Sequence, residues 1–176
     1  MIAPPAILDA LEKAAKIVAD RSQRIGIGVA VRPGAALPDI SSQAAVGRAL
    51  LEADSVVYNR ASTGLYFETR VKKMGLEAQL APKTKRLPDG AAVMKHLLRG
   101  QGREIGFGAT TEILLLREQG LQFVGPLPPE LQKFTTYTAT ATTAVAQPEA
   151  AQALLRHLAS PASRAGYVAA GIAAPP

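Results

Sequence analysis

The stretch from Asp54 to Gly75 (DSVVYNRASTGLYFETRVKKMG) constrains the fold of this chain more than any other. It begins with a short apolar run at 56–58 that predicts a strand, continues through a turn of small polar residues, and then shows a helical spacing of apolar residues from Leu65 to Met74. A strand, a small-residue loop and a helix in this order are typical of α/β proteins. The start of such a helix presents unpaired backbone N–H groups and the positive end of the helix dipole.

The loop before this helix is a candidate anion site. Ser62 and Thr63 offer hydroxyl donors, and Gly64 allows a ligand to approach the backbone closely. Together with the N–H groups of the helix start, these donors suit an oxyanion. The same residue types also serve as ordinary helix caps, so the local sequence leaves both interpretations open.

The composition argues against several other kinds of site. The chain has no cysteine, which excludes disulfides, thiolate metal sites and cysteine nucleophiles. Its two histidines, His96 and His157, lie far apart in helical patterns that we interpret as surface or boundary positions, and no metal-binding spacing is present. The net charge is +6, but the cations are scattered and not interleaved with aromatic residues. This pattern predicts mild steering of small anions and no nucleic acid binding.

Neither a leader nor a membrane span is evident in the sequence. The first residues, MIAPPAILDALEKAAKIV, lack the charged and apolar regions of a signal peptide. No apolar run is long enough to cross a bilayer. We therefore expect the chain as written to stay in the compartment where it is made, which is the cytoplasm if this short form is natural.

Helix and strand patterns alternate along the chain and predict an α/β fold with a largely parallel sheet. A helix is expected from Pro4 and Pro5 to about Ala19, and strands are expected at 25–31, 55–58, 104–108, 121–124 and 134–145. The first and last of these strands would cross between two lobes. Lobe two would then comprise residues 33–137, and a partial lobe one, with the crossing strands, residues 1–32 and 138–176. The outer pieces are interpreted as helical, with few strands of their own.

Five longer segments carry a resemblance to a known family. They are GIGVAVRPGAALPDIS (26–41), SVVYNRASTGLYF (55–67), EIGFGATTEIL (104–114), FVGPLPPELQ (123–132) and HLASPASRAGYVAAGI (157–172). In content, order and spacing they resemble the periplasmic molybdate-binding proteins of ABC importers. The resemblance implies the α/β fold of type II periplasmic binding proteins, with one complete three-layer α/β/α lobe and an incomplete second lobe.

The resemblance also implies which positions bind the ligand. They are Ala61, Ser62, Thr63 and Gly64 at the helix start, Gly108, Ala109 and Thr110 after the EIGFG strand, and Tyr137 on the returning strand. Neutral donors of this kind can satisfy a fully ionised oxyanion such as molybdate or tungstate without a salt bridge. The implied function is the solute-binding component of an ABC importer, which closes two lobes around a small anion and meets a permease in the periplasm. Neither catalytic residues nor a cofactor are implied.

One departure from the family pattern leaves alternatives open. Family members carry further residues before the point that matches Met1, so the resemblance implies that the first strands of lobe one and two ligand-contacting loops are absent. The chain could instead be a truncated, non-binding oligomer, in which a second copy covers apolar outer helices. It could also bind a small organic acid, with Arg60 as the residue that pairs with a carboxylate. An effector-sensing domain of a transcription regulator and an enzyme are further alternatives, but we find no helix-turn-helix, nucleophile elbow or P-loop.

Overall fold

The computed structural model describes residues 2–3, 17–142 and 145–173. The chain divides into two compact units, which we call the continuous unit (residues 26–133) and the discontinuous unit (residues 1–25 and 134–176). The expected division fell after residues 32 and 137. It differs from the observed one because the strand at 27–31 is paired on both sides within the continuous unit. Tyr137 therefore belongs to the discontinuous unit.

The continuous unit is built on a five-stranded sheet of strand order β5-β4-β6-β3-β7. The strands are β3 (Ile27–Val31), β4 (Ser55–Asn59), β5 (Thr84–Leu87), β6 (Glu104–Ala109) and β7 (Gln122–Pro126). β4 pairs in parallel with β5 and β6, whereas β3 pairs antiparallel with β6 and β7. The sheet is therefore mixed, with β3 running against the other strands.

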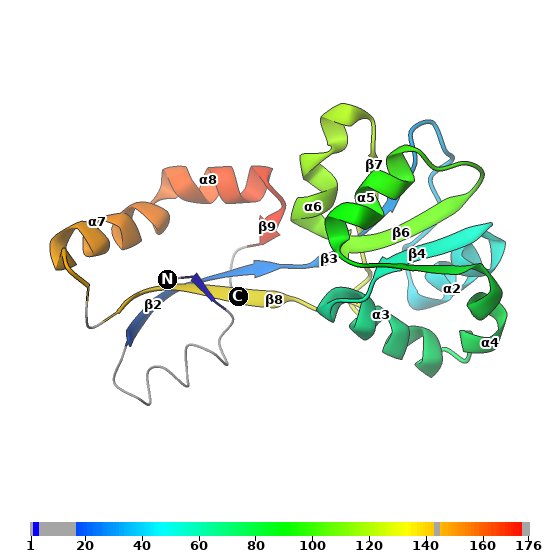
Figure 1. Ribbon diagram of the computed structural model, residues 1–176, viewed down its shortest axis with the longest axis horizontal. Helices are drawn as coiled ribbons and strands as arrows, with labels where there is room; N and C mark the ends of the chain where they lie inside the picture. Colours follow the sequence, from blue (N-terminus) through cyan, green and yellow to red (C-terminus); the bar gives the residue numbers. More distant parts are fainter. Residues whose placement is uncertain (1, 4–16, 143–144, 174–176) are drawn as a thin grey trace. The chain divides into compact units, whose positions relative to one another are not determined.

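Helices cover both faces of this sheet and make the continuous unit a three-layer structure (Figure 1). On one face the core includes Leu50 of α2 and Phe67 of α3, and on the other it includes Leu97 of α5 and Ile113 of α6. This arrangement confirms the expected α/β class and the complete α/β/α lobe. The helical segments are α2 (Gln43–Glu52), α3 (Ser62–Lys73), α4 (Glu77–Leu80), η1 (Ala81–Lys83), α5 (Gly90–Leu98), α6 (Thr110–Leu115) and η2 (Arg117–Gln119).

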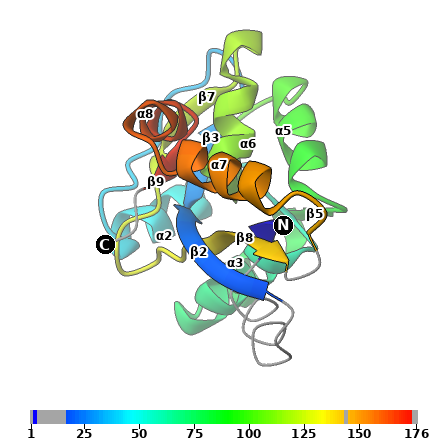
Figure 2. The same ribbon diagram turned by 90° about the vertical axis from the view of Figure 1, so that its left-hand side faces the viewer.

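The discontinuous unit contains a four-stranded sheet of order β1-β8-β2-β9. Its strands are β1 (Ile2–Ala3), β2 (Ile17–Ile25), β8 (Thr135–Thr142) and β9 (Ile172–Ala173), and all pairs are antiparallel. The helices α7 (Pro148–Leu158) and α8 (Pro161–Ala169) lie on one side of this sheet (Figure 2).

Two expectations for the discontinuous unit are wrong. The helix expected up to Ala19 cannot extend past Ile17, because residues 17–25 pair with β8 as a strand. The rest of that helix, residues 4–16, lies outside the described residues. The outer pieces are therefore not all helical. Residues 17–25 form a strand because they pair with β8, although the apolar residues of the expected helix are spaced as in a helix.

Local sequence signals account well for the helix starts of the continuous unit. The hydroxyl of Ser42 accepts from the N–H of Ala45 at 3.2 Å and caps α2, and the Asp89 carboxylate caps α5 by accepting from the N–H of Ala92 at 2.7 Å. None of the described helices has the length and apolar character needed to span a membrane. In the same part of the chain, no three His, Asp or Glu side chains are placed to hold a metal ion.

Candidate functional site

The candidate site lies in the continuous unit, at the edge of the sheet formed by the C-terminal ends of β4, β5 and β6. These strands are parallel, so their last residues, Asn59, Leu87 and Ala109, lie at the same end of the sheet. The helices α3, α5 and α6 begin shortly after these three ends. Open α/β sheets generally bind ligands outside the carboxyl ends of their strands. A small ligand would therefore meet the starts of these helices.

Asn59 organises the loop between β4 and α3. This residue is buried, and its Oδ1 accepts from the N–H of Ala61 at 3.1 Å and from the N–H of Gly64 at 2.9 Å. A Cβ added to Gly64 would overlap the Asn59 carbonyl, so the glycine is required by this packing. Two of the N–H donors expected to contact a ligand are thus bonded within the protein.

Ser62 and Thr63 keep their donors at the start of α3. Within the described part of the unit, no group accepts from the backbone N–H or the hydroxyl of either residue. Ser62 is exposed and Thr63 is half-buried. The helix has 12 residues, so its dipole places the equivalent of about half a positive charge at this end. The donors and the dipole at this helix start are of the kind that suits an anion.

Arg60 adds a full positive charge next to these donors. Its backbone N–H donates to the carbonyl of Leu87 at 2.8 Å, which holds the residue at the sheet edge. Its side chain is exposed and forms no ion pair with the described residues of this unit. Arg60 can therefore pair with a carboxylate or another anionic group of a ligand.

The second expected group of ligand contacts, at the end of β6, is largely engaged in the scaffold. Thr110 is buried, and both its N–H and its hydroxyl donate to the carbonyl of Gly26 at 3.0 Å. The N–H of Ala109 donates to Oε2 of Glu112 at 3.3 Å. Gly108 is buried within the β6 strand. These residues cap α6 and join it to β3, and they leave few donors for a ligand.

Tyr137, the last of the expected ligand residues, lies on β8 of the discontinuous unit. It is half-buried and stands opposite Gln23 of β2 in the ladder. Its role in binding remains a proposal.

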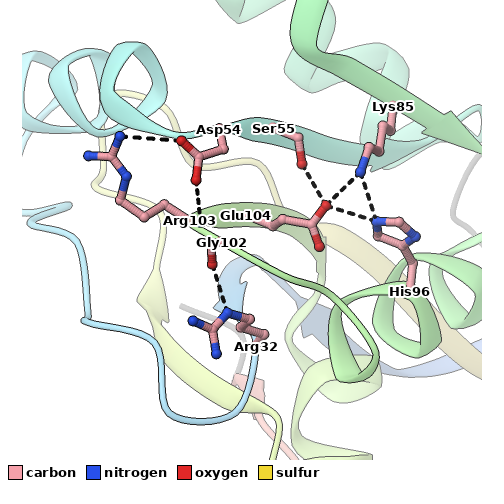
Figure 3. A network of polar contacts seen from close by, with 8 residues as sticks. All are labelled: Arg32, Asp54, Ser55, Lys85, His96, Gly102, Arg103 and Glu104. Atoms are coloured by element: carbon pink, nitrogen blue, oxygen red, sulfur yellow. Dashed lines mark hydrogen bonds and ion pairs between the residues drawn. The ribbon is translucent and has the colours of Figure 1, made fainter.

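A buried carboxylate that the sequence analysis did not predict lies at the opposite, N-terminal ends of β4, β5 and β6 (Figure 3). The Glu104 side chain is only 5% exposed, and its Oε1 accepts from Ser55 Oγ at 2.7 Å, Lys85 Nζ at 2.6 Å and His96 Nε2 at 3.1 Å. Burial raises the pKa of Glu104, but the hydrogen bonds from Lys85, Ser55 and His96 outweigh this effect, so the pKa lies below its ordinary value. The cluster joins β4, β5, β6 and α5. His96 is therefore part of a structural network.

Gln132 is a second residue that sequence reasoning missed. Its side-chain amide accepts from the N–H of Ile27 at 2.7 Å and donates to the Ile27 carbonyl at 3.0 Å, as a neighbouring strand would. The Tyr66 hydroxyl donates to the Gln132 carbonyl at 3.3 Å, and Arg70 donates to the Glu130 carbonyl at 2.8 Å. Helix α3 is thus tied to the segment through which the chain leaves the continuous unit.

Comparisons with known proteins point to one family. A family model described as bacterial extracellular solute-binding protein matches residues 1–173. The substrate-binding domain assigned to a molybdenum ABC transporter of Clostridium difficile has a TM-score of 0.80 at 14% identity, over 99% of this chain and 76% of that one. The periplasmic molybdate-binding protein of Azotobacter vinelandii has a TM-score of 0.70 at 15% identity, over 99% of this chain and 78% of that one. At these identities the structures establish the shared type II periplasmic-binding-protein fold.

Another relative is named as an enzyme and has a higher sequence identity to this chain than the two structures above. Aconitate isomerase of a Pseudomonas species is 32% identical over 157 residues, which are 87% of this chain and 58% of that protein. The chain thus spans somewhat more than half the length of this relative.

Proposed function

Because the chain belongs to the bacterial extracellular solute-binding protein family, we propose that it is the solute-binding component of an ABC importer and binds a small anion. The observation that carries the proposal is the start of α3, where Ser62 and Thr63 hold donors that no described residue accepts, and where Arg60 forms no ion pair with any described residue of this unit. Binding without turnover, a periplasmic location and a permease partner are parts of the same proposal. The alternative of a truncated, non-binding oligomer has no support from the comparisons and is not proposed.

The first candidate ligand is a tetrahedral oxyanion such as molybdate or tungstate. Two solved relatives whose names refer to molybdenum or molybdate support it. The backbone and hydroxyl donors of Ser62 and Thr63 are the neutral groups that suit such an anion. In this proposal the Tyr137 hydroxyl supplies a further donor.

The second candidate ligand is a small organic acid. It is supported by Arg60, whose guanidinium can bind a carboxylate through two parallel hydrogen bonds, and by the relative named for aconitate, a tricarboxylate. A carboxylate at the start of α3 would be stabilised by the same helix dipole as an oxyanion. The two candidates therefore share one site and differ in whether Arg60 is needed.

Thermal unfolding with added anions tests the proposal. The protein is measured alone and with molybdate, tungstate, sulfate, phosphate, citrate or trans-aconitate. A ligand that binds the folded state stabilises it by about 2.7 kcal/mol at a concentration 100 times its Kd, so a selective rise in Tm identifies the class of ligand. If no anion raises the Tm, the proposed function is wrong.

Variants of the expected contacts locate the site. Thr63→Ala and Ser62→Ala are each expected to weaken binding of the stabilising anion by about 1–3 kcal/mol, the range for a lost hydrogen bond to a charged group. Thr69→Ala is the matched control, because this exposed hydroxyl on the same helix donates to the carbonyl of Tyr66. Tyr137→Phe tests the contact proposed from the discontinuous unit. Equal affinities for wild type and the Ser62 and Thr63 variants would refute this location.

A further inference from the structure

The two segments through which the chain passes between its units are joined by one side chain. We call residues 25–27 and 132–134 the crossing segments, because each contains a boundary between the units. The amide oxygen of the Gln132 side chain accepts from the N–H of Ile27 at 2.7 Å and from the N–H of Lys133 at 2.9 Å. Its amide nitrogen donates to the Ile27 carbonyl at 3.0 Å. Gln132 therefore fixes the first crossing segment to the second within the continuous unit.

Tyr66 attaches helix α3 to the second crossing segment. Its hydroxyl donates to the Gln132 carbonyl at 3.3 Å and accepts from Nε of Arg70 at 2.8 Å. A hydroxyl that accepts from a charged guanidinium is polarised and becomes a better donor. The Lys133 ammonium lies 4.9 Å from the centre of the Tyr66 ring. Both the hydroxyl and the ring of Tyr66 thus contact this segment.

The same helix face begins at the candidate anion donors. Ser62, Tyr66 and Arg70 are spaced four residues apart in α3, so they follow one another along one face of the helix. Four residues correspond to a rise of about 6 Å along the axis. An anion held by Ser62 and Thr63 would therefore bind about one helical turn from Tyr66. Since an intact helix moves as a rigid element, holding its start also restrains Tyr66.

Resting on the proposed function, we propose that Tyr66 is a positioning residue that couples anion binding at the start of α3 to the contact between the crossing segments. Local opening of this contact separates Gln132 from Ile27, and it requires Gln132 either to leave Tyr66 or to move α3. A bound anion opposes this opening because it holds α3 at its start. The coupling is the same for either candidate ligand, because both bind at this helix start.

Amide hydrogen exchange, followed residue by residue by NMR, tests the coupling. The protein is measured alone and saturated with whichever of molybdate, tungstate, citrate and trans-aconitate raises its Tm most. Val57 lies in β4, which is paired on both sides, so its amide reports the slowing that binding imposes on the whole unit. In the wild type, the anion is expected to slow exchange at Ile27 at least about fivefold more than at Val57, the lower end of usual coupling factors.

Two tyrosine variants identify the residue that transmits the effect. Tyr66→Phe removes the hydroxyl, keeps the ring beside Lys133 and leaves the donors at the start of α3 unchanged. This variant should still bind the anion, but the excess slowing at Ile27 should fall below about twofold. Tyr167→Phe is the matched control, because the Tyr167 hydroxyl also donates to a backbone carbonyl, that of Leu158 at 3.0 Å, in the discontinuous unit. Its excess slowing should equal that of the wild type.

Reciprocity gives a second readout that a purely structural role of Tyr66 would not produce. If the anion favours the joined crossing segments by some factor, the joined segments favour the anion by the same factor. Gln132→Met cannot accept from the Ile27 N–H, so it represents the opened contact. The Kd of the anion, measured by isothermal titration, should therefore rise in Gln132→Met by the excess slowing seen at Ile27 in the wild type.

The outcomes separate this inference from the proposed function. If the anion binds but slows Ile27 no more than Val57 in the wild type, the coupling is overturned and the anion-binding function stands. Full excess slowing in Tyr66→Phe, or an unchanged Kd in Gln132→Met, also overturns the coupling. If none of the four anions binds, the proposed function fails together with this inference.

Discussion

Replacing Asn59 with alanine is expected to destabilise the protein by about 1.5–4.5 kcal/mol. The substitution removes the acceptor for two backbone donors. The N–H of Gly64 is buried, so leaving it without an acceptor costs about 1–3 kcal/mol. The N–H of Ala61 belongs to an exposed residue that water can reach, so losing its hydrogen bond costs only about 0.5–1.5 kcal/mol. The sum exceeds the usual cost of losing a helix cap because one donor has no solvent substitute.

Urea unfolding followed by far-ultraviolet circular dichroism measures this loss, with Asn59→Asp as the matched variant. Aspartate keeps an oxygen for both N–H groups and places its charge at the start of α3, where it is favourable, so its stability should be close to that of the wild type. The same charge should weaken anion binding at Ser62 and Thr63. A loss below about 1 kcal/mol in Asn59→Ala, or equal losses in both variants, would refute the assigned role of the Asn59 side chain.

Two further predictions concern the rest of the continuous unit. Gln132→Met should destabilise the protein by about 1–3 kcal/mol and speed hydrogen exchange at the Ile27 amide, because that buried N–H loses its acceptor. Unchanged exchange at Ile27 would contradict this role of the Gln132 side chain. Burial raises the pKa of Glu104, but hydrogen bonds from Lys85 and two other donors outweigh this effect and lower the pKa below 4.5. The stability that the ionised carboxylate adds is therefore complete above its unfolded-state pKa and is lost as the pH falls through its folded-state pKa. Urea midpoints measured from pH 7 downward should therefore depend less on pH in Glu104→Gln than in the wild type, and parallel curves would contradict this account.

The parts of the fold that local signals control could be predicted from the sequence. The succession from β4 through its loop to α3 and the Ser42 cap depend on residues within a few positions of each other. β2 could not be predicted, because its partner β8 lies more than a hundred residues away, and the pairing of Ile17 with Thr142 is visible only in the register. The assignment of β3 to lobe one was wrong for the same reason, because its partners β6 and β7 are also distant in the sequence. Its apolar run predicts a buried strand but does not say which sheet it joins.

The candidate site was harder to predict, because helix capping and anion binding use the same chemical groups. Serine, threonine, glycine and a free N–H identify a helix start, but only the three-dimensional structure tells which donors are already used. The acceptor for Thr110 is Gly26, 84 positions away, and the acceptor for Gly64 is a side chain on the preceding strand. Because the scaffold takes these donors, the ones left for a ligand are those of Ser62 and Thr63. We therefore expect a site with so few neutral donors to depend more on a charged neighbour such as Arg60 than a motif of small residues suggests.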